Sequence, residues 1–335
     1  MHPFGKTLTA LAAALFLSGP ALAPAAETVY PLTIENGPRS INFEAAPKRV
    51  VTNCDANIIE LMFALGLEDN MAGYAGFVEE GNDVAPQYRE KLKKIPVVAP
   101  GYVTLEPLLA ANPDFFLSGY RYGLNIPGDT TADAITPEEL EKHGIKSYAI
   151  TESLIRVMKK PPVSLEDTYA DLTNLGRIFN VQDRAEAAIK AMKDRVAAVQ
   201  AKLAGAKGEK PKVFIYQTWN APDQPPRTVG AQAMPSAILA MAGAENIFAD
   251  VDDSYITASW EDVVARNPDA ILLLECGHAD GEARKRTLLD NPVLKDVRAV
   301  KDGRVVVLRV EEFYPGPRAV DGLEKLARAL HPALF

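Results

Sequence analysis

Cysteine is scarce in this chain, and its scarcity argues against stabilisation by a disulfide framework or by a structural zinc site. Cys54 and Cys276 are the only two cysteines among 335 residues, and they lie far apart in the sequence. They do not make the disulfide framework on which many small secreted domains depend. They are also a poor zinc site, because structural zinc usually takes four ligands with short local spacings. We expect two free, partly buried thiols.

Positive charge and long apolar runs are also in short supply. Lys and Arg number 36 against 44 Asp and Glu, which gives a formal net charge of −8. Nucleic acids bind basic faces that neutralise their phosphates, so this balance argues against such a partner. Beyond the first residues, no stretch has the roughly 20 apolar residues that a membrane-spanning helix needs. The composition is that of a globular, acidic protein.

The first 25 residues have the pattern of an export signal. Lys6 gives a short basic start, and residues 8–18 form an apolar run of about ten residues, the length of a signal-peptide core. Ala23 and Ala25 offer an A-x-A cleavage pattern, so we expect the mature chain to start near Ala26. No cysteine stands there to accept a lipid. A disordered start on a cytosolic protein is the alternative, and we favour a soluble monomer in a Gram-negative periplasm.

Strands and helices alternate in two separate parts of the remaining chain. In the first part, residues 49–52 read as a buried strand running into a helix over 55–65. Strands near 213–216, 271–274 and 305–308, with a final helix over 319–330, mark the second part. Such alternation is typical of α/β lobes with mostly parallel sheets. We therefore predict an N-terminal lobe over 26–163 and a C-terminal lobe over 205–335, with a ligand cleft between them.

The segment between these lobes, residues 164–204, has a different pattern. Apolar residues recur every three or four positions, as at Leu165, Tyr169 and Leu172, and resume after Asn180. This predicts about 40 residues of amphipathic helix, with a bend near Asn180. Two ordinary packed helices would also fit the pattern. We favour a long rigid backbone helix that joins two Rossmann-like lobes.

One sequence segment occurs twice. Residues 104–114 and 259–269 each place a glutamate at a helix start, and each ends in Asn-Pro-Asp before an apolar strand. Asn-Pro-Asp is a strong helix stop and turn, and glutamate suits the positive end of a helix. The repeat suggests two equivalent lobes. Glu106 and Glu261 could then dock onto basic residues of a two-fold importer, although both could equally be solvated helix-start residues.

The order and spacing of these features resemble the class III periplasmic binding proteins. This helical-backbone group serves ABC importers of ferric siderophores, haem and vitamin B12. The resemblance extends from about Pro47 to Pro332 and rests on residues 49–51, 58–67, 104–114, 171–179, 259–269, 315–318 and 323–327. It implies little hinge motion, and a permease partner whose arginines engage Glu106 and Glu261.

Ligands of open α/β sheets bind beyond the carboxyl ends of the strands. The side chains that follow the predicted strands are rich in aromatic residues and arginine, and they also include Asp55 and Gln217. We expect ligand contacts from Tyr120, Arg121, Tyr122, Trp219, Arg227, His278, Tyr314 and Arg318. The guanidinium group of arginine donates paired hydrogen bonds to carboxylate, catecholate or hydroxamate oxygens, and aromatic faces add apolar contact. This suits a net-anionic metal chelate, and we expect a ferric siderophore and no intrinsic cofactor.

Other ligands and other functions fit the residues less well. Haem could take Tyr120, Tyr122 or His278 as an axial ligand, and vitamin B12 would suit aromatic walls. A free-metal site needs three or four His or carboxylate ligands, and only His143, His278 and His331 lie outside the export signal. No G-x-S-x-G, H-E-x-x-H or glycine-rich phosphate loop occurs, so a hydrolase has little support.

Overall fold

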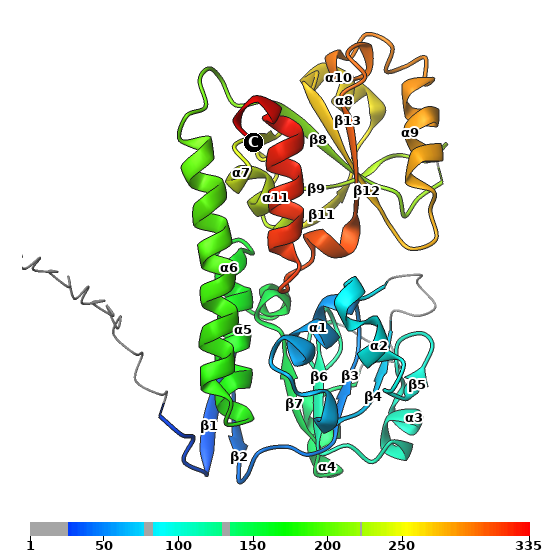
Figure 1. Cartoon of the computed structure of the whole chain (residues 1–335). Helices are drawn as coiled ribbons and strands as arrows, with labels where there is room; N and C mark the ends of the chain where they lie inside the picture. The colour runs from blue at the N-terminus through cyan, green and yellow to red at the C-terminus, as the bar shows by residue number, and fades with distance from the viewer. Residues whose placement is uncertain (1–25, 77–82, 129–134, 222) are drawn as a thin grey trace, which may run out of the picture.

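The computed structural model describes residues 26–76, 83–128, 135–221 and 223–335. The predicted signal peptide lies outside the described residues. The chain forms two α/β lobes, one above the other in Figure 1, with the long helix α6 (Gln182–Leu203) running along one side of both. The predicted two-lobed α/β architecture is confirmed. No helix in the described ranges combines the length and apolar character needed to cross a membrane.

The N-terminal lobe is built on a five-stranded parallel sheet in the order β5-β4-β3-β6-β7. Its central strands carry only buried residues, which explains why they read as continuous apolar runs in the sequence. The strands are β3 (Val50–Thr52), β4 (Met71–Ala75), β5 (Val97–Ala99), β6 (Phe115–Ser118) and β7 (Lys146–Ala149). The helices are α1 (Ala56–Ala64), α2 (Arg89–Leu92), α3 (Leu105–Ala110) and α4 (Pro137–Lys142), with 3-10 turns η1 (Glu68–Asn70), η2 (Pro86–Tyr88) and η3 (Thr151–Arg156).

A hairpin that the sequence analysis did not predict precedes this lobe. Strands β1 (Leu32–Asn36) and β2 (Arg39–Phe43) pair antiparallel around Gly37, whose φ of 66° belongs to the left-handed region that a tight turn requires. Asn36 fastens the hairpin to the lobe, because its Nδ2 donates to the Ala149 carbonyl at 2.8 Å.

The C-terminal lobe contains a mixed sheet in the order β11-β9-β8-β12-β13, with β10 beside β8. The three expected strands form its parallel core, and the unpredicted strands β9 and β11 add an antiparallel edge. The strands are β8 (Lys212–Gln217), β9 (Arg227–Val229), β10 (Glu245–Asn246), β11 (Tyr255–Thr257), β12 (Ala270–Glu275) and β13 (Val305–Arg309). The helices are α7 (Met234–Met241), α8 (Trp260–Arg266), α9 (Gly281–Leu289), α10 (Arg298–Lys301) and α11 (Ala319–Leu330), with 3-10 turns η4 (Val310–Phe313) and η5 (Pro332–Leu334).

The expectation of one bent helix over residues 164–204 needs a correction. Two helices fill this segment, α5 (Leu165–Ile178) and α6, and they pack side by side in Figure 1. Asn180 adopts a left-handed φ of 56°, and the Val181 N–H donates to the Gly176 carbonyl at 2.8 Å, which ends α5 in a Schellman motif. The chain therefore reverses where a bend was predicted, and α6 alone spans both lobes.

Arginines on α6 attach this helix to each lobe. Arg184 donates to the Leu65 and Gly66 carbonyls at the end of α1, both at 3.1 Å. About three turns further on, Arg195 pairs with Asp321 at 2.6 Å and with Glu324 at 2.7 Å on α11. A helix held at both lobes in this way sets their relative position.

Candidate ligand-binding site

A cavity of about 260 Å³ lies between the two lobes and is lined by residues of both. It opens beyond the carboxyl ends of the central strands, where open α/β sheets bind ligands. The N-terminal lobe contributes Asp55, Tyr102, Tyr120 and Arg156, and the C-terminal lobe contributes Gln217, Trp219, Arg227, Tyr255 and Tyr314. Five of these nine side chains are aromatic, so the wall is largely apolar ring surface with polar groups at its edges.

Tyr120 is held in place by a closed set of contacts from η3. Its backbone adopts a left-handed φ of 56°, and its N–H donates to Ser153 Oγ at 2.6 Å. Ser153 Oγ in turn donates to Glu152 at 2.9 Å, and Glu152 pairs with Arg156 at 3.2 Å. The Arg156 guanidinium completes the set by lying 5.0 Å from the centre of the Tyr120 ring. The Tyr120 ring is therefore pre-positioned before a ligand arrives.

The tyrosines Tyr120, Tyr255 and Tyr314 in the cavity remain protonated at neutral pH, because the pKa of each is raised. Burial raises the pKa of Tyr120 and of Tyr314 well above the usual range, and the nearby Asp55 carboxylate raises both further. Burial is also the main cause of the raised pKa of Tyr255, followed by the charge of Glu152. The wall thus presents protonated phenol groups, and those of Tyr120 and Tyr255 share a side-chain hydrogen bond.

Two polar atoms in the wall have no hydrogen-bond partner among the described residues. They are Gln217 Oε1, on a side chain that is 2% exposed, and Arg227 Nε. A buried polar atom without a partner costs free energy, so a ligand that pairs with these atoms gains from relieving that cost. The cavity therefore calls for a ligand that has both a donor and an acceptor.

The charges around the cavity balance. Asp55 carries a negative charge and Arg227 a positive one, and the positive charge of Arg156 is paired with Glu152 behind it. This balance differs from the arginine-rich surroundings that we expected to suit a net-anionic chelate. The difference arises because Arg156 has its own carboxylate, and because Arg318 has its charged partner outside the cavity.

The residues predicted to contact ligand fall into two groups. Tyr120, Trp219, Arg227 and Tyr314 line the cavity together. The other four do not line it: Tyr122 packs behind the wall with its ring 5.0 Å from that of Tyr102, Arg121 is half-buried, His278 is exposed, and Arg318 is part of an interlobe ion pair. Sequence reasoning placed Asp55 and Gln217 after strands without choosing them. Tyr102, Arg156 and Tyr255 were not predicted: Tyr102 and Arg156 lie a few residues after β5 and β7, and Tyr255 lies on the three-residue strand β11.

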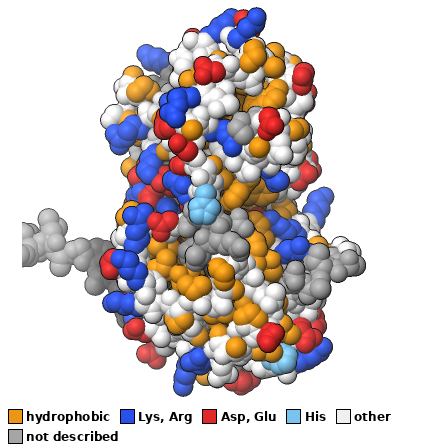
Figure 2. Space-filling view, turned by 90° about the vertical axis from the view of Figure 1, so that its right-hand side faces the viewer, with side chains coloured by type: hydrophobic (Ala, Val, Ile, Leu, Met, Phe, Trp, Pro, Cys, Tyr) orange, Lys and Arg blue, Asp and Glu red, His pale blue; other side chains and the backbone are white. Residues whose placement is uncertain are grey.

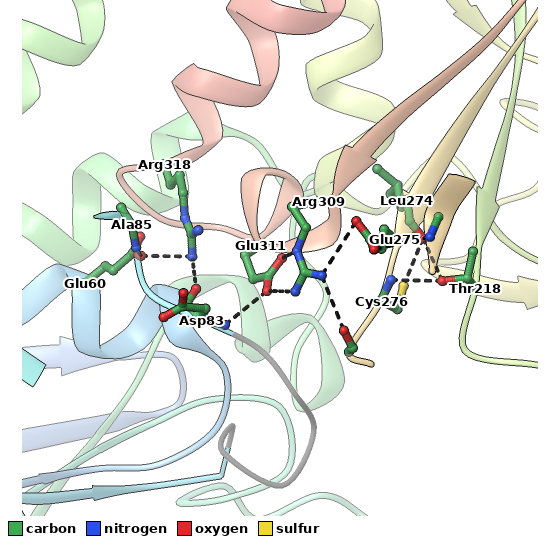
Figure 3. A network of polar contacts seen from close by, with 12 residues as sticks. Glu60, Asp83, Ala85, Thr218, Leu274, Glu275, Cys276, Arg309, Glu311 and Arg318 are labelled. Carbon is green, nitrogen blue, oxygen red and sulfur yellow. Dashed lines mark hydrogen bonds and ion pairs between the residues drawn. The ribbon is translucent and has the colours of Figure 1, made fainter. Parts of the chain in front are cut away.

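Arg318 belongs to a polar network that joins the lobes beside the cavity, shown in Figure 3. Its Nη2 lies 2.9 Å from Glu60 of α1 and donates to the Asp83 carbonyl at 2.6 Å. The Asp83 N–H crosses back to Glu311 at 3.1 Å, and Arg309 holds Glu311 at 2.5 Å. Burial raises the pKa of Glu60 to about 7, although Arg318 opposes the shift.

The repeated segments take equivalent positions in the two lobes. Asn112 and Asn267 both adopt left-handed φ values, 48° and 41°, and end α3 and α8. The two aspartates that follow accept backbone N–H groups at the start of a central strand, Asp114 from Arg49 at 2.9 Å and Asp269 from Lys212 at 2.8 Å. The Asn-Pro-Asp part of the repeat is therefore structural.

The two glutamates of the repeat have no part in these contacts. Glu106 and Glu261 are exposed in the first turns of α3 and α8, one on each lobe. Figure 2 shows acidic and basic side chains interspersed over both lobes, with hydrophobic side chains at the level where the lobes meet. A partner that recognises the paired glutamates would have to contact both lobes.

Metal-ligating side chains do not gather in the described part of the chain. Nowhere in these ranges do three or more His, Cys, Asp or Glu side chains stand so as to hold a metal ion. Cys54 and Cys276 are both free and buried, and burial raises the pKa of Cys276 to about 12. Both thiols are therefore protonated and weak as metal ligands.

Comparison with known proteins gives the chain its family. A curated relative, an uncharacterised ABC transporter substrate-binding lipoprotein of Bacillus subtilis, is 26% identical over 310 residues, which cover 92% of this chain and 88% of the relative. The vitamin B12-binding protein of Photorhabdus laumondii is 26% identical over 290 residues, or 86% of this chain and 89% of that protein.

A solved structure agrees with these relatives. It comes from an ABC-type Fe³⁺-hydroxamate transport system of Saccharomonospora viridis and superposes with a TM-score of 0.71 at 25% identity, covering 90% of this chain and 99% of that one. The family described as "Periplasmic binding protein" matches residues 52–311. The chain therefore belongs to the periplasmic binding proteins, which are substrate-binding components of ABC transporters and not enzymes.

Proposed function

We propose that the protein captures an uncharged ferric siderophore-type complex between its lobes and delivers it to the permease of an ABC importer. The observation that carries this proposal is the cavity itself, which is aromatic, charge-balanced and lined by both lobes. Aromatic rings provide apolar contact to the organic shell of a chelate, and the balanced charges offer no net attraction to a strongly anionic one. Neutral ferric hydroxamates meet both conditions.

Hydrogen bonding in the cavity supports the same class of ligand. Gln217 Oε1 accepts and Arg227 Nε donates, and neither has a partner among the described residues. Hydroxamate chelates expose amide N–H groups and carbonyl or hydroxamate oxygens, which match this acceptor and donor. The related structure from Saccharomonospora viridis, named for Fe³⁺-hydroxamate transport, adds support for this choice.

A corrinoid such as vitamin B12 is the second candidate. Its peripheral amide groups would also pair with Gln217 and Arg227, and the relative from Photorhabdus laumondii is named for binding this vitamin. Haem fits less well, because its two propionates need cations and its iron needs an axial donor. The raised pKa values of Tyr120 and Tyr314 keep these residues as phenols, and His278 does not line the cavity.

Delivery would depend on the exposed glutamates of the repeat. Glu106 and Glu261 stand one on each lobe, so a two-fold permease with two basic patches could engage both at once. Exposed charge pairs contribute to orientation and association rate more than to affinity. We propose that these two glutamates set the docking geometry and have no part in ligand binding.

Tryptophan fluorescence tests the ligand proposal directly. The chain has two tryptophans: Trp219 lines the cavity, and Trp260 packs in the C-terminal lobe with its ring 5.6 Å from that of Tyr216. Purified protein would be titrated with a neutral ferric trihydroxamate, a trianionic ferric tricatecholate, cyanocobalamin and haem. We expect saturable quenching by the trihydroxamate. The Trp219→Phe variant should lose most of this quenching, and Trp260 serves as the internal reference.

The other outcomes of these titrations would change or contradict the proposed ligand. Saturation by cyanocobalamin alone would replace the siderophore with a corrinoid as the ligand. Saturation by the tricatecholate alone would contradict the argument from charge balance, and no saturable binding of any metal chelate would contradict the proposed function.

A further inference from the structure

A buried carboxylate lies directly behind the cavity without lining it. Glu152 belongs to η3, and its side chain is 5% exposed, whereas that of its partner Arg156 is 23% exposed and lines the cavity. Both carboxylate oxygens of Glu152 lie near Arg156 Nη1, at 3.2 Å and 3.3 Å, and Ser153 donates to one of them at 2.9 Å. The guanidinium thus stands between Glu152 and the space that a ligand would occupy.

We propose that Glu152 is a specificity-determining residue that sets the ligand charge which the cavity accepts. It cancels the charge of Arg156 and leaves the guanidinium as a flat hydrogen-bonding and ring-stacking group over Tyr120. The cavity therefore discriminates against anionic chelates. This inference rests on the proposed function and adds the residue that produces the charge selectivity.

Coulomb's law indicates the size of the effect. An anion in the cavity at ~4 Å from the guanidinium would be ~7 Å from a carboxylate on its far side, so the carboxylate offsets about half of the attraction. At an effective dielectric constant of ~20, losing that repulsion would strengthen the binding of an anion by roughly tenfold or more per ligand charge. An uncharged ligand would experience almost no change.

A purely structural role for Glu152 is the alternative. A half-buried arginine is stabilised by a charged partner, and Glu152 also accepts from Ser153, which holds the Tyr120 backbone. Loss of such a support would weaken the binding of every ligand to a similar degree. The two roles are therefore separated by the ratio of affinities for anionic and neutral ligands, and not by affinity itself.

The test compares charge variants of the pair. Glu152→Gln keeps the shape of the side chain and removes its charge. We expect the affinity ratio of the tricatecholate to the trihydroxamate to rise at least tenfold, with trihydroxamate binding changed by less than about threefold. Glu152→Asp keeps the charge and should retain a ratio near that of the wild type. Glu186→Gln removes an exposed carboxylate on α6 as the matched control and should change neither affinity.

A double variant excludes indirect effects. Glu152→Gln combined with Arg156→Gln removes both charges, so its ratio should return close to the wild-type value. If Glu152→Gln binds both chelates with an unchanged ratio, or if the double variant keeps the raised ratio, the assignment to Glu152 is overturned.

A second readout needs no chelate and separates this inference from the proposed function. Iodide is an anionic and acrylamide a neutral quencher of tryptophan, and Trp219 is 40% exposed at the cavity. Glu152→Gln should raise quenching by iodide and leave that by acrylamide unchanged, and the Trp219→Phe background should abolish the difference. Should the wild type bind no chelate, the proposed function fails, and iodide quenching still decides whether Glu152 controls the charge of the cavity. Equal iodide quenching in the two proteins would contradict it.

Discussion

The Arg318 guanidinium of the C-terminal lobe lies 2.9 Å from the Glu60 carboxylate of the N-terminal lobe, with side chains that are 10% and 1% exposed. Close by, Asn57 Nδ2 of α1 donates to the Pro315 carbonyl at 2.7 Å. Together with the arginines of α6, these contacts fasten the lobes beside the cavity. This arrangement supports the expectation of little hinge motion, because opening the lobes would expose a buried charge pair.

Glu60 should make stability depend on pH. Its folded-state pKa of about 7 is raised from 4.5, mainly by burial, so the folded protein holds the proton more tightly than the unfolded chain does. The stabilisation from this group is fully present below pH 4.5 and is lost as the pH rises through 7. A shift of this size corresponds to about 3 kcal/mol in the free energy of unfolding.

The Glu60→Gln variant isolates this dependence. Between pH 4.5 and 8, the free energy of unfolding of the variant should rise by about 3 kcal/mol relative to that of the wild type. Asp171, whose pKa burial also raises to about 7, is present in both proteins and cancels. Urea unfolding at several pH values measures the difference, and a difference that stays constant with pH would contradict the prediction.

The buried carbonyl oxygen of Gln217 should strengthen ligand binding and lower the stability of the ligand-free protein. This Oε1 has no hydrogen-bond partner among the described residues. Gln217→Leu should therefore raise the free energy of unfolding of the ligand-free protein by between zero and about 1 kcal/mol. The same change should weaken binding of the chelate about five- to tenfold. Thermal unfolding and fluorescence titration measure the two effects, and a variant with unchanged affinity would remove Gln217 from the site.

Charge reversal at both Glu106 and Glu261 should abolish uptake and leave ligand affinity intact, because both residues are exposed and outside the cavity. The readout is accumulation of the iron chelate in cells that carry the importer. Glu282→Arg reverses an exposed first-turn glutamate on α9 and serves as the matched control. Normal uptake by the double variant would reject the docking role.

Gly176 should be required for the close packing of α5 against α6. A Cβ at this position would lie 2.7 Å from the Cβ of Ala185, which is closer than side-chain atoms approach. Gly176→Ala should therefore destabilise the protein by about 1–3 kcal/mol. Gly205→Ala is the control, since a Cβ there would meet only ordinary contacts. Equal stability of the two variants in urea would show that the helix pair can separate without cost.

Local signals in the sequence predicted most of the elements, but not those that depend on context. Buried parallel strands such as β6 and β12 read as apolar runs, and α11 carries a clear helical stripe. The β1–β2 hairpin was missed, although its strands alternate buried and exposed residues around Asn36-Gly37, a strong turn signal. Strands β9 and β11 are three residues each, too short to show a period.

The segment 164–204 shows the limit of periodicity. Its apolar spacing is the same for one bent helix and for two packed helices, because each buries a single stripe. Only the left-handed Asn180 and the close approach at Gly176 determine that the chain reverses. A left-handed residue is favoured at asparagine but not required there, so the sequence alone left both arrangements open.

Local pattern and chain order are enough to predict the two-lobed α/β class, the equivalence of the repeats and the positions of the side chains that follow the strands. Which of those side chains share a cavity was decided only by tertiary structure. Arg318 pairs with Glu60 of the other lobe and does not line the cavity, whereas Arg156 of the 3-10 turn η3 does line it. Charge balance in a cavity depends on distances between segments far apart in the chain, and these exist only after the lobes have packed.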